Sequence, residues 1–337
     1  MREPVGSRAA SPSKPVRDLV DGLLTGDKRA AAKLISLIED DEPEAEAALA
    51  LVYPHTGHAQ YVGLTGAPGV GKSSLINRLV REFRSRDKRV GVVAVDPTSP
   101  YSGGAVLGDR IRMADTGIDP GVFIRSMATR GHAGGLALAT FDAVRVLDAM
   151  GMDIVLVETV GAGQSEVEIA SRAHTTVVVE MPLTGDAVQT MKAGILEIGD
   201  IYVVNKTDLA DADTLVANLR FQIEERDGWR PPIVRTSALE DQRIDELADS
   251  IEQHRAFLES SGRWETRELT RARQEILENA RRLLADRVER GPQGSEFERL
   301  ARDVVGRAID PLAAANQLLR PHSRRSGPRA KSTARSR

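Results

Sequence analysis

The chain has 337 residues, of which 41% are apolar and 28% charged, with a formal net charge of -3, a balance typical of soluble globular proteins. It argues against an intrinsically disordered chain, a membrane protein and a general nucleic-acid binder. Cysteine is absent, which excludes disulfides and thiolate metal sites and favours a reducing, cytoplasmic location.

The chain begins with two segments that precede the main domain. Residues 1–17 are basic and rich in Ser and Pro, without the apolar core of a secretory signal, and are predicted to be a disordered leader. A mitochondrial transit peptide, which is also poor in acidic residues, is the alternative. Residues 18–58 are predicted to form a helical segment, which the Pro and Gly of residues 53–58 end.

Seven short apolar runs alternate with helix-compatible stretches through the main domain, predicted over residues 59–261. The runs cover residues 61–65, 90–95, 122–126, 154–158, 175–180, 201–204 and 233–236. Val- and Ile-rich runs without polar alternation are typical of strands buried on both faces. They predict a doubly wound, mostly parallel α/β sheet, and all are far shorter than the roughly 20 residues that span a bilayer. Ligands of such sheets bind at the carboxyl ends of the strands.

A phosphate-binding loop follows the first run. It matches the Walker A pattern between a predicted strand and a predicted helix, and its residues are Gly66, Ala67, Pro68, Gly69, Val70, Gly71, Lys72 and Ser73. Glycines let the backbone aim its amides at phosphate oxygens, and the helix presents its positive N-terminal end. We expect Lys72 to bridge the β- and γ-phosphates, Ser73 to bind Mg²⁺, and Ser74 to contact the α-phosphate.

Further magnesium and switch residues are predicted at the ends of later runs. Asp96 ends the second run and could reach Mg²⁺ directly or through water, with a turn-forming aspartate as the alternative. Asp109 is a second candidate. Glu158 ends the fourth run and is predicted in the magnesium site, and the Gly161 amide is predicted to sense the γ-phosphate.

The position after Gly161 carries consequences for the hydrolysis rate. Small GTPases place a water-orienting Gln there, whereas this chain has Ala162, and the nearest amide is Gln164. We therefore expect slow hydrolysis by the protein alone and stimulation by a protein partner.

A guanine-reading segment follows the sixth run. Asn205, Lys206 and Asp208 fit the pattern Asn-Lys-x-Asp, and an aspartate there can accept both the N1–H and the 2-amino hydrogen of guanine. Ser237 and Ala238 follow the next run, where a GTPase supports the base. The segment predicts selection of GTP over ATP.

Residues 262–319 are predicted to form a C-terminal helical arm. An apolar stripe recurs at steps of three and four residues, and its members are Leu269, Ala272, Ile276, Ala280 and Leu283. A second helix is predicted from about Ser295. We favour burial of the stripe in a homodimer, with packing onto the chain's own main domain as the alternative. Residues 320–337 are predicted to be a disordered basic tail.

These motifs resemble those of the MeaB/ArgK-type GTPases, within the SIMIBI class of P-loop proteins. The resemblance covers residues 60–261 and rests on residues 66–73, 95–97, 107–110, 125–131, 158–161, 163–166 and 205–208. It implies a GTP-driven chaperone that gates loading of adenosylcobalamin onto methylmalonyl-CoA mutase and helps to eject damaged cobalamin. It also implies that Asp96, Asp109 and Glu158 are magnesium and switch residues, and that the C-terminal arm dimerises.

One coupling loop departs from this family. The family often reads Gly-Asp-Glu-Leu-Gln-Gly-Ile-Lys, whereas residues 185–192 read Gly-Asp-Ala-Val-Gln-Thr-Met-Lys. The difference leaves open which adenosylcobalamin-dependent acyl-CoA mutase is the client. Two other functions also stay open: a metallochaperone GTPase that delivers nickel, and a P-loop kinase acting on a small molecule or protein. The chain has no Cys and few His for the first, and guanine selection by Asp208 would be unusual for the second.

Overall fold

The structure is a computed structural model that describes residues 12–96, 119–128, 133–159, 172–182, 197–209, 212–289 and 294–319. The chain divides into two compact units, Met1–Glu268 and Leu269–Arg337. The first unit contains the sheet and all of the predicted site residues that the structure describes, and the described part of the second is helical. None of the described helices is long and apolar enough to cross a bilayer.

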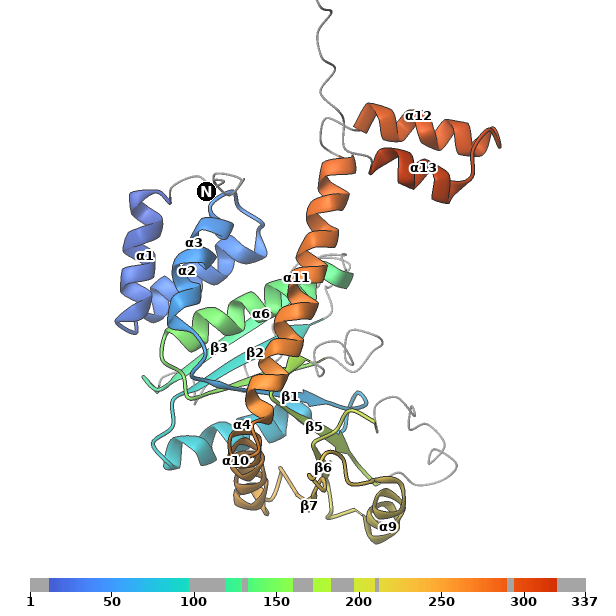
Figure 1. The fold of residues 1–337 in the computed structure, drawn as a ribbon. Helices are drawn as coiled ribbons and strands as arrows, with labels where there is room; N and C mark the ends of the chain where they lie inside the picture. The colour runs from blue at the N-terminus through green and yellow to red at the C-terminus, as the bar shows by residue number, and fades with distance from the viewer. Residues whose placement is uncertain are drawn as a thin grey trace, which may run out of the picture. The chain divides into compact units, whose positions relative to one another are not determined.

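A seven-stranded sheet forms the centre of the first unit (Figure 1). Its strands are β1 (Gln60–Thr65), β2 (Val90–Asp96), β3 (Val122–Ala128), β4 (Ile154–Glu158), β5 (Thr175–Glu180), β6 (Ile201–Val204) and β7 (Ile233–Arg235). Their order is β3-β2-β4-β1-β5-β6-β7, and every neighbouring pair is parallel. The predicted doubly wound α/β fold is confirmed, and each of the seven apolar runs forms a strand.

Helices cover both faces of this sheet, which explains why the strands are mostly apolar instead of alternating between apolar and polar residues. On one face, α4 (Lys72–Ser85) and α10 (Ile244–Ser260) share a core with Leu64, Val177 and Val203. On the other face, α6 (Ala133–Ala149) packs on Val93 and Val155, while α9 (Ala212–Gln222) packs on the alternate residues of β5 and β6. Since β1 lies between β4 and β5 and all three strands are parallel, their carboxyl ends lie side by side.

Three helices at the start of the chain complete the first unit. They are α1 (Lys14–Leu24), α2 (Lys28–Glu39) and α3 (Ala45–Val52), followed by the short 3-10 helix η1 (Tyr53–His55). Their buried residues, such as Leu23, Leu34 and Ile35, belong to the same hydrophobic core as α6 and β2. Arg125 of β3 pairs with Glu39 at the end of α2. The helical segment predicted near the N-terminus therefore shares its core with the sheet.

Three helices end the described part of the chain, and the second unit contains all of them except the first turns of the first helix. α11 (Arg263–Glu289) begins in the first unit and has no buried residue, while α12 (Gly294–Val305) and α13 (Pro311–Leu318) pack on each other through Leu300, Ala314 and Leu318. The side chain of Asp310 caps α13 by accepting a hydrogen bond from the Ala313 amide at 2.9 Å. Helix α12 starts close to the predicted position, whereas α13 was not predicted as a separate helix.

Candidate nucleotide-binding site

The predicted phosphate loop lies between the end of β1 and the start of α4. Gly66 and Gly71 both have left-handed backbones, with φ of 145° and 97°. A Cβ atom on Gly66 would lie 2.1 Å from the Val179 carbonyl oxygen, and one on Gly71 would lie 2.4 Å from Asn205 Nδ2. Only glycine lets the loop approach β5 and the segment after β6 this closely.

Lys72 places a buried ammonium group over this loop. Its Nζ donates to the carbonyl oxygens of Gly66 and Ala67, at 2.6 and 3.1 Å, and the residue is 6% exposed. Because Lys72 is also the first residue of α4, the same place receives the positive end of the helix. The arrangement suits a polyanion such as the phosphates of a nucleotide.

The predicted magnesium ligands Ser73 and Glu158 meet beside the loop. The Ser73 hydroxyl donates to Glu158 Oε1 at 2.6 Å, and Glu158 is 7% exposed at the end of β4. A hydroxyl and a carboxylate are hard oxygen donors of the kind that Mg²⁺ prefers, so this pair fits the ion. Asp96 ends β2, next to β4, but its side chain lies outside the described part of the structure, as do Asp109 and Gly161.

Asn205 connects the predicted guanine reader to the phosphate loop. Its Nδ2 donates to the Val70 carbonyl oxygen at 2.8 Å, and its Oδ1 accepts from the Thr236 hydroxyl and the Ala238 amide, both at 3.1 Å. Lys206 has a φ of 59°, and its Nζ donates to the Gly69 carbonyl oxygen at 2.8 Å. The segments after β1, β6 and β7 are thus joined by side-chain hydrogen bonds.

A hydrogen bond from the neighbouring loop orients the Asp208 carboxylate. Ser237 donates its hydroxyl to Asp208 Oδ1 at 3.0 Å, and this contact spans 29 residues of sequence. Ser237 is buried, whereas Asp208 is exposed. A carboxylate oriented in this way can accept two donors from the edge of a guanine ring.

Glu180 also belongs to the site, although none of the sequence motifs includes it. It is the last residue of β5, beside the loop, and its backbone carbonyl accepts from the Asn205 amide at 2.8 Å. Burial raises the pKa of its carboxyl group to about 7, and the Lys72 ammonium partly opposes this rise. Its position at the carboxyl end of a strand is the signal that could have found it.

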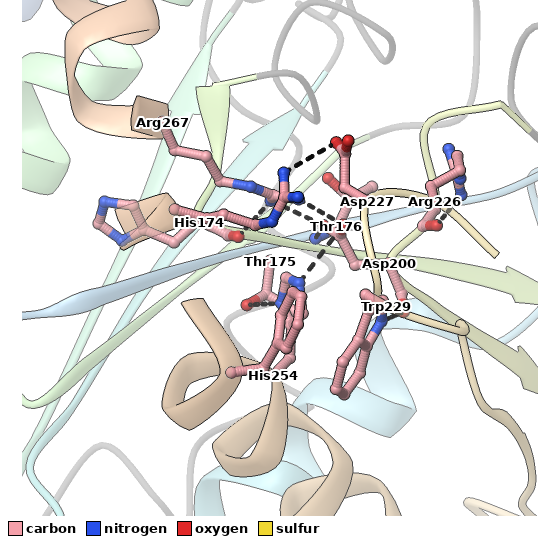
Figure 2. A network of polar contacts seen from close by, with 12 residues as sticks. His174, Thr175, Thr176, Asp200, Arg226, Asp227, Trp229, His254 and Arg267 are labelled. Carbon is pink, nitrogen blue, oxygen red and sulfur yellow. Dashed lines mark hydrogen bonds and ion pairs between the residues drawn. The ribbon is translucent and has the colours of Figure 1, made fainter. Parts of the chain in front are cut away.

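A second polar cluster lies at the opposite, amino edge of β5 and β6 (Figure 2). Asp200 accepts from Arg267 at 2.6 and 3.0 Å and from the Thr176 amide at 2.8 Å. His254 is fully buried, its Nδ1 lies 2.9 Å from the Thr175 hydroxyl, and burial lowers its pKa to about 4. A cavity of about 320 Å³ adjoins this cluster. The cluster and its cavity lie at the amino end of β6, whereas Asn205 follows the carboxyl end of this strand, so they are separate from the nucleotide site.

The arrangement of the nucleotide site places the chain among the P-loop nucleotide-binding proteins. A Walker A loop, a carboxylate beside its serine and an Asn-Lys-x-Asp segment lie together at the carboxyl edge of a parallel sheet. The family model described as "Methylmalonyl Co-A mutase-associated GTPase MeaB" matches residues 31–293. The chain belongs to this family, and its sequence motifs already showed a resemblance to the same family.

Individual relatives agree with the family match. The "Putative GTPase" of Pyrococcus abyssi (strain GE5 / Orsay) is 49% identical over 311 residues, which cover 90% of this chain and 96% of the relative. GTPase ArgK of Escherichia coli (strain K12) is 35% identical over 253 residues, covering 72% and 76%. The crystal structure of LAO/AO transport system kinase superposes with a TM-score of 0.67 at 24% identity, covering 92% of this chain and 98% of the other, which supports the fold.

Proposed function

We propose that this protein binds GTP together with Mg²⁺ and hydrolyses it to GDP and phosphate. The hydrogen bond from Asn205 to the Val70 carbonyl oxygen carries this proposal, because it couples the base-reading segment directly to the phosphate loop. A nucleotide that fills the loop would then present its base to Asp208. Membership in a family of GTPases supports the same function.

Different residues around the loop bind the phosphates, the magnesium ion and the guanine base. The loop amides and Lys72 hold the β- and γ-phosphates, and Ser74 contacts the α-phosphate. Ser73, Asp96, Asp109 and Glu158 hold the magnesium ion, which when bound neutralises charge that develops on the transferred phosphoryl group. Asp208 accepts the N1–H and 2-amino hydrogens of guanine, while Asn205, Ser237 and Ala238 keep its segment in place.

Hydrolysis by the protein alone is slow, and a protein partner accelerates it. The Gly161 amide senses the γ-phosphate, but Ala162 follows it and offers no side chain that could orient the attacking water. A partner that completes or reorders this segment would therefore raise kcat.

The partner is an adenosylcobalamin-dependent acyl-CoA mutase, with methylmalonyl-CoA mutase first among the clients. The description of the matching family model names this mutase, and the family match covers most of the chain. The protein acts in the cytoplasm as a homodimer whose nucleotide cycle gates transfer of intact cofactor to the mutase. The exposed apolar stripe of α11 supports the dimer.

The test is a hydrolysis assay with GTP, and with ATP as the control, for the protein alone and with purified adenosylcobalamin-dependent acyl-CoA mutases. We expect slow GTP turnover alone and strong acceleration by one mutase. GTP turnover that no mutase changes would leave a GTPase but refute the chaperone role. Preference for ATP would refute the role of Asp208.

A further inference from the structure

Arg78 links the phosphate-binding helix to the loop that follows β7. It lies on α4, the helix that Lys72 begins, and its Nε donates to the Ala238 carbonyl oxygen at 2.9 Å. Its Nη2 donates to the Leu239 carbonyl oxygen at 3.2 Å, and its Nη1 lies 3.2 Å from Asp241 Oδ2. One planar guanidinium therefore holds three residues of a single loop, which its fixed set of donors allows.

The same loop supports the residues that read the base. The amide of Ala238 donates to Asn205, while the carbonyl of Ala238 accepts from Arg78. The neighbouring residue, Ser237, donates to Asp208. Ala238 is thus held from both sides of its backbone, by the base-reading segment on one side and by the phosphate-binding helix on the other.

We propose that Arg78 is a positioning residue for guanine recognition. By fixing residues 238–241 to α4, it keeps Ser237 and Ala238 where they orient Asp208 and Asn205. The distance between the phosphate loop and the base-reading carboxylate is then set by a direct link as well as by the sheet. This inference rests on the proposed binding of GTP and adds a residue that the sequence motifs do not contain.

The two carbonyl contacts carry this role, and the ion pair contributes little to it. Asp241 has a side chain that is 60% exposed, and pairs in such surroundings are screened by water. The Arg78 side chain is 26% exposed, and its bonds to the carbonyls are charge-assisted. Arg78→Lys keeps the positive charge but loses the planar set of donors that reaches both carbonyl oxygens, whereas Asp241→Asn removes only the ion pair.

Arg86, at the end of the helix that carries Arg78, provides a matched control. Its guanidinium, just after the end of α4, contacts Glu82, Asp249 and Glu252 at 2.6–2.8 Å and so ties this helix to α10. These contacts lie on α10 and α4 and include no residue of the loop after β7. Arg86→Ala therefore removes a comparable link between elements without touching the base-reading loop.

The experiment measures the Kd of GDP and of ADP, and the KM and kcat for GTP, for the wild type, Arg78→Ala, Arg78→Lys, Asp241→Asn and Arg86→Ala. We expect Arg78→Ala to weaken GDP binding about tenfold, or about 1.4 kcal/mol, and ADP binding much less. KM for GTP should rise while kcat changes little. Arg78→Lys should recover part of the preference for GDP, and the other two variants should keep it.

Two results would overturn the inference, and they are distinguishable. If the wild type prefers GDP but Arg78→Ala keeps the same ratio of GDP to ADP affinity, Arg78 only stabilises the fold. If the wild type shows no preference for GDP, guanine recognition by Asp208 fails and the role of Arg78 fails with it. Should Arg78→Ala not fold, the affinity ratio of Arg78→Lys decides the question in the same way.

Discussion

Gly66 and Gly69 both have left-handed backbones but differ in what surrounds them. Gly69 has a φ of 82°, and a Cβ atom added to it would have no neighbour within 4 Å, whereas a Cβ atom on Gly66 would lie 2.1 Å from the Val179 carbonyl oxygen. An alanine at Gly69 would meet only the backbone penalty of about 1–2 kcal/mol. At Gly66 the loop itself would have to move away from β5.

This difference predicts unequal effects of alanine at the two positions. Gly66→Ala should abolish nucleotide binding, because the displaced backbone no longer aims its amides into the loop. Gly69→Ala should lower stability but retain measurable binding. Titration with GDP, together with thermal melting of both variants, checks this prediction. Equal loss of binding in the two variants would contradict it.

Glu180 makes stability depend on pH through its raised pKa. The ordinary pKa is 4.5 and the folded value is about 7, so the folded state binds the proton more tightly than the unfolded state. The stability that this proton contributes is fully present below pH 4.5 and is lost as the pH rises through 7. His254 acts in the opposite direction, since its lowered pKa contributes stability that is lost as the pH falls from 6.5 through 4.

We therefore predict that Glu180→Gln alters the pH profile of unfolding. Between about pH 4.5 and 7, the free energy of unfolding of the wild type should decline with rising pH relative to that of the variant. Urea unfolding at several pH values gives both curves, and their difference cancels the contribution of His254. A constant difference across this range would show that Glu180 keeps an ordinary pKa.

The first turns of α11 are fixed to the amino edge of the sheet. Arg267 pairs with Asp200, which precedes β6, and Glu268 lies 2.6 Å from His174, which precedes β5. Trp264 packs on the His174 ring with a centroid distance of 4.1 Å. Helix α11 has no buried residue, so these contacts rather than core packing hold its first turns.

Loss of Arg267 should therefore destabilise the first unit. Arg267→Ala leaves the buried Asp200 carboxylate without its two guanidinium donors, and we expect a cost of about 1–3 kcal/mol in the free energy of unfolding. Arg263→Ala is the matched control on the same helix, because its partner Asp227 has a side chain that is 77% exposed. Urea unfolding measures both variants, and an equal effect of the two would exclude a special role for Arg267.

Local sequence patterns predicted some of the C-terminal helices but not all of them. The stripe and the Gly-Pro interruption indicated α11 and the start of α12, because both signals are local in sequence. The helix α13 was not separated from α12, although Asp310 followed by Pro311 is a local helix-start signal. The packing of α13 on Leu300 of α12 is what no local pattern reports. The predicted domain boundaries at residues 58 and 261 stay predictions.

Helix α11 leaves a row of large apolar side chains exposed, which bears on the oligomeric state of the protein. Ile276 is 70% exposed and Leu283 is 57% exposed, with Leu269, Leu277 and Leu284 also open to solvent. Burial of such side chains stabilises by about 1.5–3 kcal/mol each when they are fully covered. A second copy of the chain is the cover that we propose.

The double variant Ile276→Asp with Leu283→Asp should convert the proposed dimer to a monomer. Charged groups in the middle of the covered stripe would lose their hydration on association. Sedimentation analysis gives the mass directly, and Phe221→Asp on α9 is the control because Phe221 is 91% exposed outside the arm. A wild type that is itself monomeric would refute the dimer.

The seven strands, the phosphate loop and the base-reading segment could all be predicted from local sequence patterns. These features depend on residues close together in the chain: glycines beside a lysine, short apolar runs, and a tetrapeptide after a strand. Lys72, Ser73, Glu158, Asn205 and Asp208 were therefore identified as candidate site residues from the sequence alone. Their roles in binding remain proposals, and Asp96, Asp109 and Gly161 stay predictions because the structure does not describe those side chains or segments.

Which of these segments contact one another depends on the order of the strands in the folded sheet. Asn205 meets Val70 across 135 residues of sequence, and Arg78 meets Ala238 across 160, because the order β1-β5-β6-β7 brings distant segments to one edge. The raised pKa of Glu180 likewise comes from burial, which depends on every element packed around it. Contacts of this kind leave no local pattern, since either partner could have met another residue in a different strand order.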